Sequence, residues 1–251
     1  MARGQRITRI KGWVRLLILI TIFSLISCGI ILTLALTRTN RGNLLVAEQR
    51  FYMVASSRNT SLALANRDAA ALRAMGGAGF VAHTEEAFYT IAAVYRTSTE
   101  AQAVADRLSQ QEGFNATVFI RISPRITRVV DCFLEAEVLA ELLTRPLELI
   151  DALTTLSIDL SANRVSDSHA MWLLNSKRGG LVSLSNNITN LNEEFIYAQS
   201  TLNEFYANML VAFTNAASLS FSNNLSVNIL HLVPLIIETF YNTVLNLQLI
   251  V

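Results

Sequence analysis

The longest apolar run in the chain lies close to its beginning, at residues 16–36. These 21 residues include no charged side chain and no proline. As a helix rising about 1.5 Å per residue, the run would be about 31 Å long, which matches the hydrocarbon thickness of a bilayer. A helix is the form in which one segment satisfies its own backbone hydrogen bonds inside lipid. The pattern therefore predicts a transmembrane helix over residues 16–36 rather than the buried helix of a soluble core.

The basic residues on either side of this run predict its orientation in the membrane. Five of them precede it, and two follow it before the first acidic residue, Glu48. The positive-inside rule then places residues 1–15 in the cytoplasm and residues 37–251 outside, as in a single-pass protein of the cell membrane. Two alternatives stay open: a cleaved secretory signal, and a lipoprotein cleavage site that would leave Cys28 as an acylated N-terminus. The run stays apolar for eight residues after Cys28, which favours the uncleaved anchor.

A repeated pattern follows a predicted linker at residues 37–49. Residues 51–58 and 88–96 both open with aromatic residues and continue with β-branched and small ones, which is typical of strands. Each segment precedes an alanine-rich stretch with apolar residues at helical spacing, and then a further extended run, at residues 78–83 and 114–122. The order strand–helix–strand, repeated once, predicts an α+β domain of ferredoxin-like βαββαβ order. Its four strands would form an antiparallel sheet with two helices on one face.

Residues at the ends of these two helices indicate where each helix begins and ends. Gly76 and Gly77 are expected to end the first helix. Thr97 and Glu100 have the spacing of a capping box and are expected to begin the second, which Gly113 ends.

The remaining residues, 124–251, predict an all-helical module. Residues 131–160 are rich in leucine, and Pro146 is expected to kink or divide their helix. Residues 163–183 show little periodicity, and the glycine pair at 179–180 is expected to break any helix there.

The last two segments have the strongest helical patterns. In residues 184–219, apolar positions alternate at spacings of four and three over five heptads, which predicts one long helix in a bundle or coiled coil. Its flanking positions lack paired opposite charges, so a bundle within the chain is favoured, with a protein partner or homo-oligomer as the alternative. Residues 224–251 are apolar apart from a narrow stripe that includes His231 and Glu238. The charge disfavours a second membrane span and predicts a helix in the middle of the bundle, with contact to the outer membrane surface as the alternative.

The charges divide unevenly along the chain. Residues 1–128 contain 16 basic and 7 acidic residues, a net charge of +9, whereas residues 129–251 contain 4 and 12, a net charge of −8. Opposite signs in adjacent regions predict two modules that attract each other. Many of the basic residues only flank the apolar run, and the C-terminal half is acidic, so nucleic acid is not an expected partner.

Residues that support catalysis or metal binding are sparse. Cys28 and Cys132 are far apart, so no disulfide framework is expected. The three histidines stand at no spacing that suits a metal, and no phosphate-binding glycine loop or nucleophile motif occurs. We therefore expect no enzymatic activity, no metal and no cofactor.

Residues 50–123, about 30% of the chain, resemble the SPOR (sporulation-related repeat) domain, a bacterial module. The resemblance is carried by the aromatic first strand, the alanine-rich helix ending in glycine, the spacing from Tyr95 to Ala101 and Leu108, and a Gly–Phe pair at 113–114 before the last strand. It implies binding to peptidoglycan, in particular to glycan strands stripped of stem peptides, and hence localisation to the division septum or to sites of sporulation.

This chain departs from the family in the first strand. The SPOR domain has Gln followed shortly by Gly there, whereas this chain has Val54 or Ala55 followed by Ser56 or Ser57. An amide that would hydrogen-bond a sugar is therefore missing.

Strand alternation assigns the candidate ligand contacts. Val54, Ile91, Val118 and Ile120 are predicted to face the helices. The opposite face is expected to stay free and to bind glycan, unless the C-terminal region covers it. Its residues would be Met53, Ala55, Ser57, Thr90, Ala92, Thr117, Phe119 and Arg121. On this hypothesis, Phe119 stacks on a sugar ring and Arg121 bonds hydroxyl groups or a carboxylate.

The alternative function is a membrane-anchored scaffold. In it, the α+β and helical modules mediate protein–protein assembly without contacting glycan. An extracellular sensor is a weaker hypothesis, because residues 1–15 are too few to form a cytoplasmic output domain.

Overall fold

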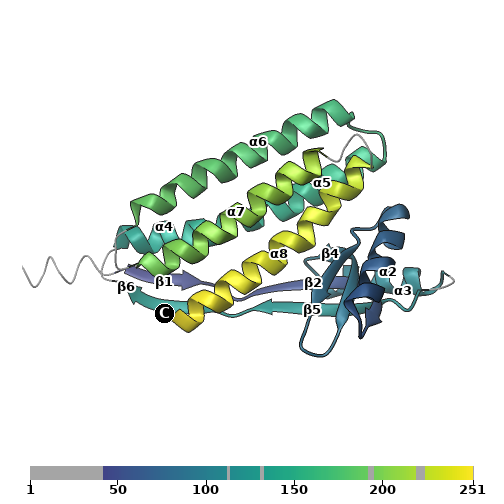
Figure 1. The fold of residues 1–251 in the computed structure, drawn as a ribbon, viewed down its shortest axis with the longest axis horizontal. Coiled ribbons are helices and arrows are strands. Elements are labelled where there is room, and N and C mark those ends of the chain that lie inside the picture. The colour runs from purple at the N-terminus through teal and green to yellow at the C-terminus, as the bar shows by residue number, and fades with distance from the viewer. Residues whose placement is uncertain (1–41, 112–113, 131–132, 192–194, 219–223, 251) are drawn as a thin grey trace, which may run out of the picture.

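The computed structural model describes residues 42–111, 114–130, 133–191, 195–218 and 224–250. The predicted cytoplasmic segment at 1–15 and transmembrane helix at 16–36 lie outside these residues, as do Cys28, Cys132 and Gly113. Within the described part, the protein is an α+β structure with antiparallel sheets and a helical C-terminal half (Figure 1).

The predicted βαββαβ order is confirmed. Its elements are β2 (Gln49–Asn59), α2 (Leu62–Ala74), β3 (Phe80–His83), β4 (Phe88–Tyr95), α3 (Ser98–Ser109) and β5 (Thr117–Ser123). The strands form one antiparallel sheet in the order β3-β4-β2-β5. Helices α2 and α3 cover one face, where Leu72, Ala101 and Ala105 form a small core with Val54 and Ala92 of the sheet.

The ends of both helices follow from their local sequence. The Thr97 hydroxyl accepts a hydrogen bond from the backbone N–H of Glu100 (3.3 Å) and donates one to its carboxylate (2.7 Å), so α3 begins where predicted. Helix α2 ends at Ala74, and Gly76 follows with φ +95°, a conformation that glycine adopts without steric cost.

A second, two-stranded sheet was not predicted. Strand β1 (Gly42–Val46) lies within the expected linker and pairs antiparallel with β6 (Ile126–Val130), which lies at the start of the predicted helical module. Since β1 leads into β2 and β5 into β6, the two pairs form one long ribbon along the helical layer (Figure 1). The expectation of a linker over residues 37–49 is therefore wrong for 42–46, and that of an all-helical module over residues 124–251 is wrong for 126–130. Five-residue strands become stable only by pairing and by packing, here on α4, and neither is visible in a local pattern.

The helical half begins with a proline-divided helix, as predicted. Helix α4 (Phe133–Thr144) ends in a 3₁₀ turn, η1 (Arg145–Glu148), which contains Pro146, and α5 (Leu149–Ser161) follows. The expected break at residues 179–180 is absent, because Gly179 and Gly180 lie inside α6 (Asp167–Asn186). A capped start at Ser166 and buried leucines along one face outweigh the cost of two glycines.

The long helix predicted over residues 184–219 is in fact two helices. Helix α6 ends at Asn186, the 3₁₀ turn η2 (Asn187–Asn190) follows, and α7 (Ile196–Ser218) begins after it. An asparagine-rich stretch interrupts the helix here although the apolar spacing continues through it. Between residues 196 and 218 most of the predicted stripe is buried, and the helix packs against α6 and α8; the buried members of the stripe are Ala198, Leu202, Phe205, Met209 and Ala216.

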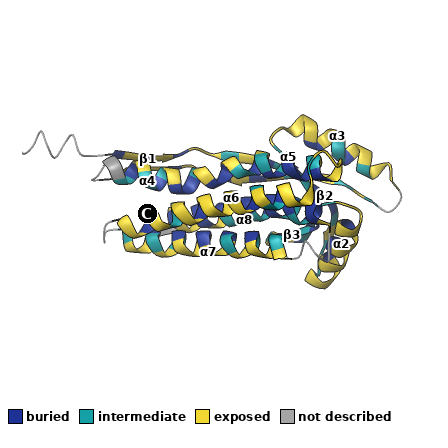
Figure 2. Ribbon diagram, turned by 90° about the horizontal axis from the view of Figure 1, so that it is seen from above, coloured by how far each residue is buried: buried dark blue, intermediate teal, exposed yellow. Residues whose placement is uncertain are grey.

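Helix α8 (Leu225–Ile250) lies in the middle of the molecule, as predicted. It packs against α5 and α7 on one side and against β3, β4 and β5 on the other. Among the described helices it is the one that is long and apolar enough to cross a membrane by composition, at Leu225–Gln248, and 56% of the 18-residue segment that meets this criterion is buried within the protein. One continuous hydrophobic core, dark blue in Figure 2, therefore joins the sheet to the helices.

Candidate functional site

The sheet face opposite α2 and α3 is largely covered. Phe51, Met53, Ala55 and Ile91 belong to the same core as the apolar residues of α8. The expectation of a free sheet face is therefore wrong over much of its area. The physical reason is that α8 is apolar on most of its surface and must be covered on several sides.

Five of the eight predicted site residues share this face. The register pairs Phe51 with Arg121, Met53 with Phe119 and Ala55 with Thr117. Residues directly opposite each other in an antiparallel pair point to the same side. Met53 and Ala55 are fully buried, Phe119 is half-buried and Thr117 is exposed.

The other three predicted site residues point the opposite way, toward α2 and α3. The Thr90 hydroxyl donates to the carbonyl of Ala65 in α2 (3.4 Å), and Ala92 belongs to the small core beneath the helices. Ser57 accepts a hydrogen bond from Asn59, whose amide also reaches Asp68 of α2 (2.9 Å).

Ile91, predicted to face the helices, lies instead in the core beneath α8. The pairing of β2 with β4 is irregular between Val54 and Ala55 and between Ala55 and Ser57. These irregularities explain the four wrong face assignments, which are those of Ser57, Thr90, Ala92 and Ile91. An extra residue in one strand moves every following side chain to the other face.

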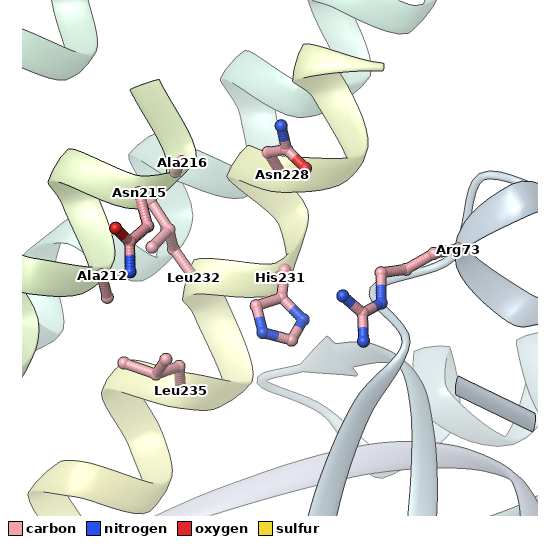
Figure 3. A pocket seen from close by; sticks show the side chains of 8 residues that line it. All are labelled: Arg73, Ala212, Asn215, Ala216, Asn228, His231, Leu232 and Leu235. Atoms are coloured by element: carbon pink, nitrogen blue, oxygen red, sulfur yellow. The ribbon is translucent and has the colours of Figure 1, made fainter. Parts of the chain in front are cut away.

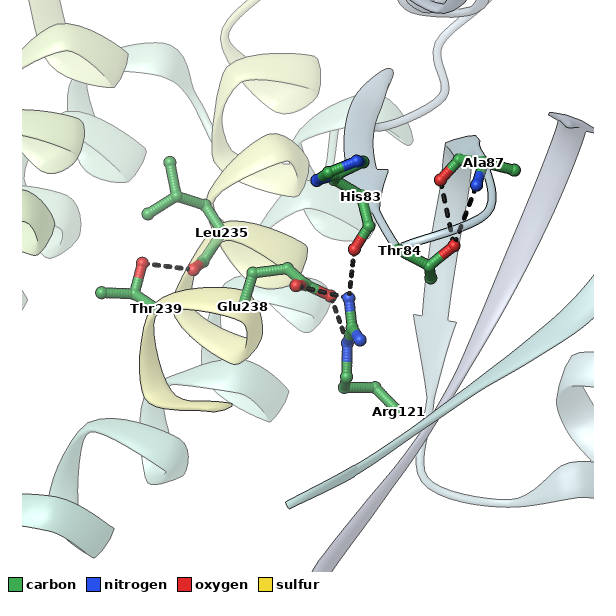
Figure 4. A network of polar contacts seen from close by, with 7 residues as sticks. All are labelled: His83, Thr84, Ala87, Arg121, Leu235, Glu238 and Thr239. Carbon is green, nitrogen blue, oxygen red and sulfur yellow. Dashed lines mark hydrogen bonds and ion pairs between the residues drawn. The ribbon is translucent and has the colours of Figure 1, made fainter. Parts of the chain in front are cut away.

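Arg121 is the central polar residue of the covered face. Its Nε and Nη2 donate to the two carboxylate oxygens of Glu238, both at 2.7 Å, and Nη2 also donates to the carbonyl of His83 at 3.2 Å (Figure 4). The guanidinium lies over the rings of Tyr241 (4.5 Å) and Phe119 (5.0 Å). Burial raises the pKa of Glu238, and the adjacent Arg121 opposes this rise. With these contacts made, Arg121 is engaged by α8 rather than free for a ligand.

A second polar contact is made by His231, about two turns earlier on α8. His231 Nδ1 lies 2.9 Å from the carbonyl oxygen of Ala78. A carbonyl only accepts, so Nδ1 carries the proton. The ring packs against Phe80, and burial lowers the pKa of His231.

A cavity of about 210 Å³ lies beside His231, where α2, α7 and α8 meet (Figure 3). Its wall is formed by Arg73, Ala212, Asn215, Ala216, Asn228, His231, Leu232 and Leu235. The amide nitrogen of Asn228 is buried and has no hydrogen-bond partner within the described part of the chain.

An aromatic pair occupies the part of the face that α8 leaves partly accessible. Tyr89 of β4 and Phe119 of β5 stack with ring centroids 4.8 Å apart and an interplanar angle of 16°. Both rings are half-buried, and the Arg58 guanidinium lies 6.0 Å from the Tyr89 ring. Sequence reasoning missed Tyr89, because alternation with Ile91, which was predicted to face the helices, assigns Tyr89 to the opposite face.

Among the described residues, no three His, Cys, Asp or Glu side chains are close enough to hold a metal ion. Comparison of the chain with protein families, curated proteins and solved structures gave no match. Function is therefore inferred from the contacts described above.

Proposed function

We propose that this chain is a non-catalytic, membrane-anchored scaffold, in which α8 joins the sheet and the helices into one body outside the membrane. The observation that carries this proposal is the buried, two-bond pair between Arg121 and Glu238, with side chains only 10% and 12% exposed. It occupies the sheet face that a ligand-binding domain of this shape would keep open. The anchor is the apolar run at residues 16–36.

The charge distribution supports the same proposal. Arg121 and Arg96, from the basic half, pair with Glu238 and Asp151 of the acidic half. The Arg96 guanidinium also donates to the carbonyl of Leu147 at 3.2 Å. These contacts join regions that are far apart in the chain and favour a rigid unit over two independent modules. Helix α7 leaves Ile196 and Tyr197 exposed at its start, which suits contact with another protein.

Co-sedimentation of the full chain with peptidoglycan sacculi tests the scaffold function. We expect no pelleting, either before or after amidase treatment that removes stem peptides. Light scattering of the detergent-solubilised chain then gives its oligomeric state. Pelleting that increases after amidase treatment would overturn the scaffold proposal.

The second candidate function is binding of denuded glycan at the division septum or at sites of sporulation, as the SPOR resemblance implies. The stacked pair of Tyr89 and Phe119 favours it, because a sugar ring packs well on an aromatic face, and the exposed Thr117 hydroxyl is close in sequence. On this hypothesis, Phe119→Ala abolishes pelleting with amidase-treated sacculi. Tyr197→Ala, at an exposed tyrosine on α7, is the matched control and leaves pelleting unchanged.

A further inference from the structure

The long ribbon exposes a row of aliphatic side chains on the face that points away from α4. Leu45 is 50% exposed, Val129 60%, Ile122 44% and Ile120 48%. We call these four residues the outer ribbon face. The register places Val129 and Leu45 on the side of the β1–β6 pair opposite to Leu44, and Ile122 and Ile120 on the side of the β2–β5 pair opposite to Phe51. Leu44 and Phe51 belong to one core, so all four residues lie on the side away from it.

The opposite side of strands β1 and β6 is covered by the rest of the protein. Leu44, Val46 and Ile126 are buried, and β1 lies against α4. The β1–β6 pair thus has apolar residues on both faces, although only one face is covered by protein. A row of exposed aliphatic residues on a folded protein marks an interaction surface.

The position of the ribbon in the chain identifies its partner. Strand β1 begins at Gly42, and only five residues separate it from the end of the apolar run at Leu36. Five fully extended residues span at most about 18 Å. If residues 16–36 cross a bilayer, β1 therefore begins close to the bilayer surface.

Basic residues accompany the apolar row. Arg125 is exposed just before β6, and Arg38 and Arg41 lie in the five-residue connection. Arg50 is paired with Glu48 at 2.7 Å, so it contributes less net charge. Aliphatic residues flanked by arginines suit the boundary between acyl chains and phosphate head groups.

We propose that the outer ribbon face docks on the lipid surface of the membrane that anchors the chain. Leu45, Val129, Ile122 and Ile120 enter the boundary with the acyl chains, and Arg125 contacts lipid phosphates. This inference rests on the proposed membrane anchor. It adds to the anchor a fixed orientation, with the outer ribbon face and helices α2 and α3 on the bilayer side and α6 and α7 directed away from it.

Fluorescence quenching on the full chain tests this orientation. The chain is reconstituted in vesicles of phosphatidylcholine and phosphatidylglycerol, with one cysteine bearing an environment-sensitive dye and with nitroxide-labelled lipids as quenchers. In a background with both native cysteines replaced by alanine, Val129→Cys reports the ribbon. Ser183→Cys, exposed on α6, is the matched control. A third sample keeps Cys28 as its label site and reports the anchor.

We expect blue-shifted emission and strong quenching by nitroxides just below the head groups for the Val129 label, and neither for the Ser183 label. Leu45→Glu should reduce the quenching at Val129, with circular dichroism as the check that the variant folds. Quenching at Cys28 by nitroxides deep in the acyl chains, with none at Val129, would overturn the docking and leave the anchor intact. No quenching at Cys28 would overturn the anchor, and the docking with it.

Discussion

The hydroxyl group of Tyr206 on α7 donates a hydrogen bond to the carbonyl of Leu142 on α4, at 2.8 Å. In an α-helix, that carbonyl would accept from the residue four positions later, which here is Pro146 and has no N–H. Tyr206 is only 1% exposed, and burial raises the pKa of its phenol. A side chain from a distant helix therefore satisfies a carbonyl that the proline leaves without its regular partner.

We expect Tyr206→Phe to lower the free energy of unfolding by about 1–3 kcal/mol, because a buried carbonyl loses its donor. The measurement is denaturant unfolding of the full chain in detergent. Tyr197→Phe, at a tyrosine that is 69% exposed, is the control and should leave stability unchanged. Equal effects of the two substitutions would show that the Leu142 carbonyl does not depend on Tyr206.

Removing one partner of the Arg121–Glu238 pair should be strongly destabilising. We expect Arg121→Met to cost about 3–5 kcal/mol, because it leaves the Glu238 carboxylate buried and unpaired. The double variant Arg121→Met with Glu238→Leu should recover most of this loss, since neither buried charge remains. Arg164 and Asp159 form an exposed pair at 2.7 Å, so Arg164→Met, as the matched control, should cost no more than about 1 kcal/mol. A double variant no more stable than Arg121→Met would contradict this account.

The protein should become less stable as the pH falls, because His231 titrates differently in the folded and unfolded chain. Burial lowers its pKa below the usual 6.5, and the neighbouring Arg73 acts in the same direction, while the hydrogen bond to Ala78 opposes the shift. Between the lowered pKa and about 6.5, the unfolded chain binds more protons than the folded one, so stability decreases as pH falls through this window. His231→Gln keeps a donor for the Ala78 carbonyl but does not titrate.

The test compares melting temperatures of the two proteins at several pH values. As the pH falls below 6.5, the melting temperature of the wild type should decrease relative to that of His231→Gln. The pKa of Glu238 is raised, so this carboxyl contributes with the opposite sign at lower pH, but it is present in both proteins and cancels in the difference. A difference that does not change with pH would contradict the prediction.

Two glycines in α6 should be replaceable with a gain in stability. A Cβ added at Gly179 or Gly180 meets nothing within 4 Å. Each change to alanine should therefore raise the free energy of unfolding by about 1 kcal/mol, as expected for a helix interior. Gly79→Ala is the contrasting variant, because φ there is +53° and a Cβ would lie 2.4 Å from the carbonyl oxygen of Ala69. It should lower the unfolding temperature, whereas the other two should raise it.

Local patterns in the sequence determined much of the fold. The repeated aromatic and β-branched segments became β2 and β4, and the capping pair Thr97 and Glu100 began α3. Pro146 divided a helix as expected, and the apolar tail became the central α8. Each of these signals lies within a few residues and acts through backbone geometry or through a single apolar face.

The tertiary structure decided what covers each surface. Irregular strand registers moved Ser57, Thr90, Ala92 and Ile91 to faces that simple alternation did not assign. The short strands β1 and β6 depend on each other across about 80 residues. Most important for function, Arg121 and Glu238 are 117 residues apart, and their pairing closes the sheet face that the sequence left open. Such contacts depend on long-range packing of apolar surface, and no local pattern specifies which two surfaces will meet.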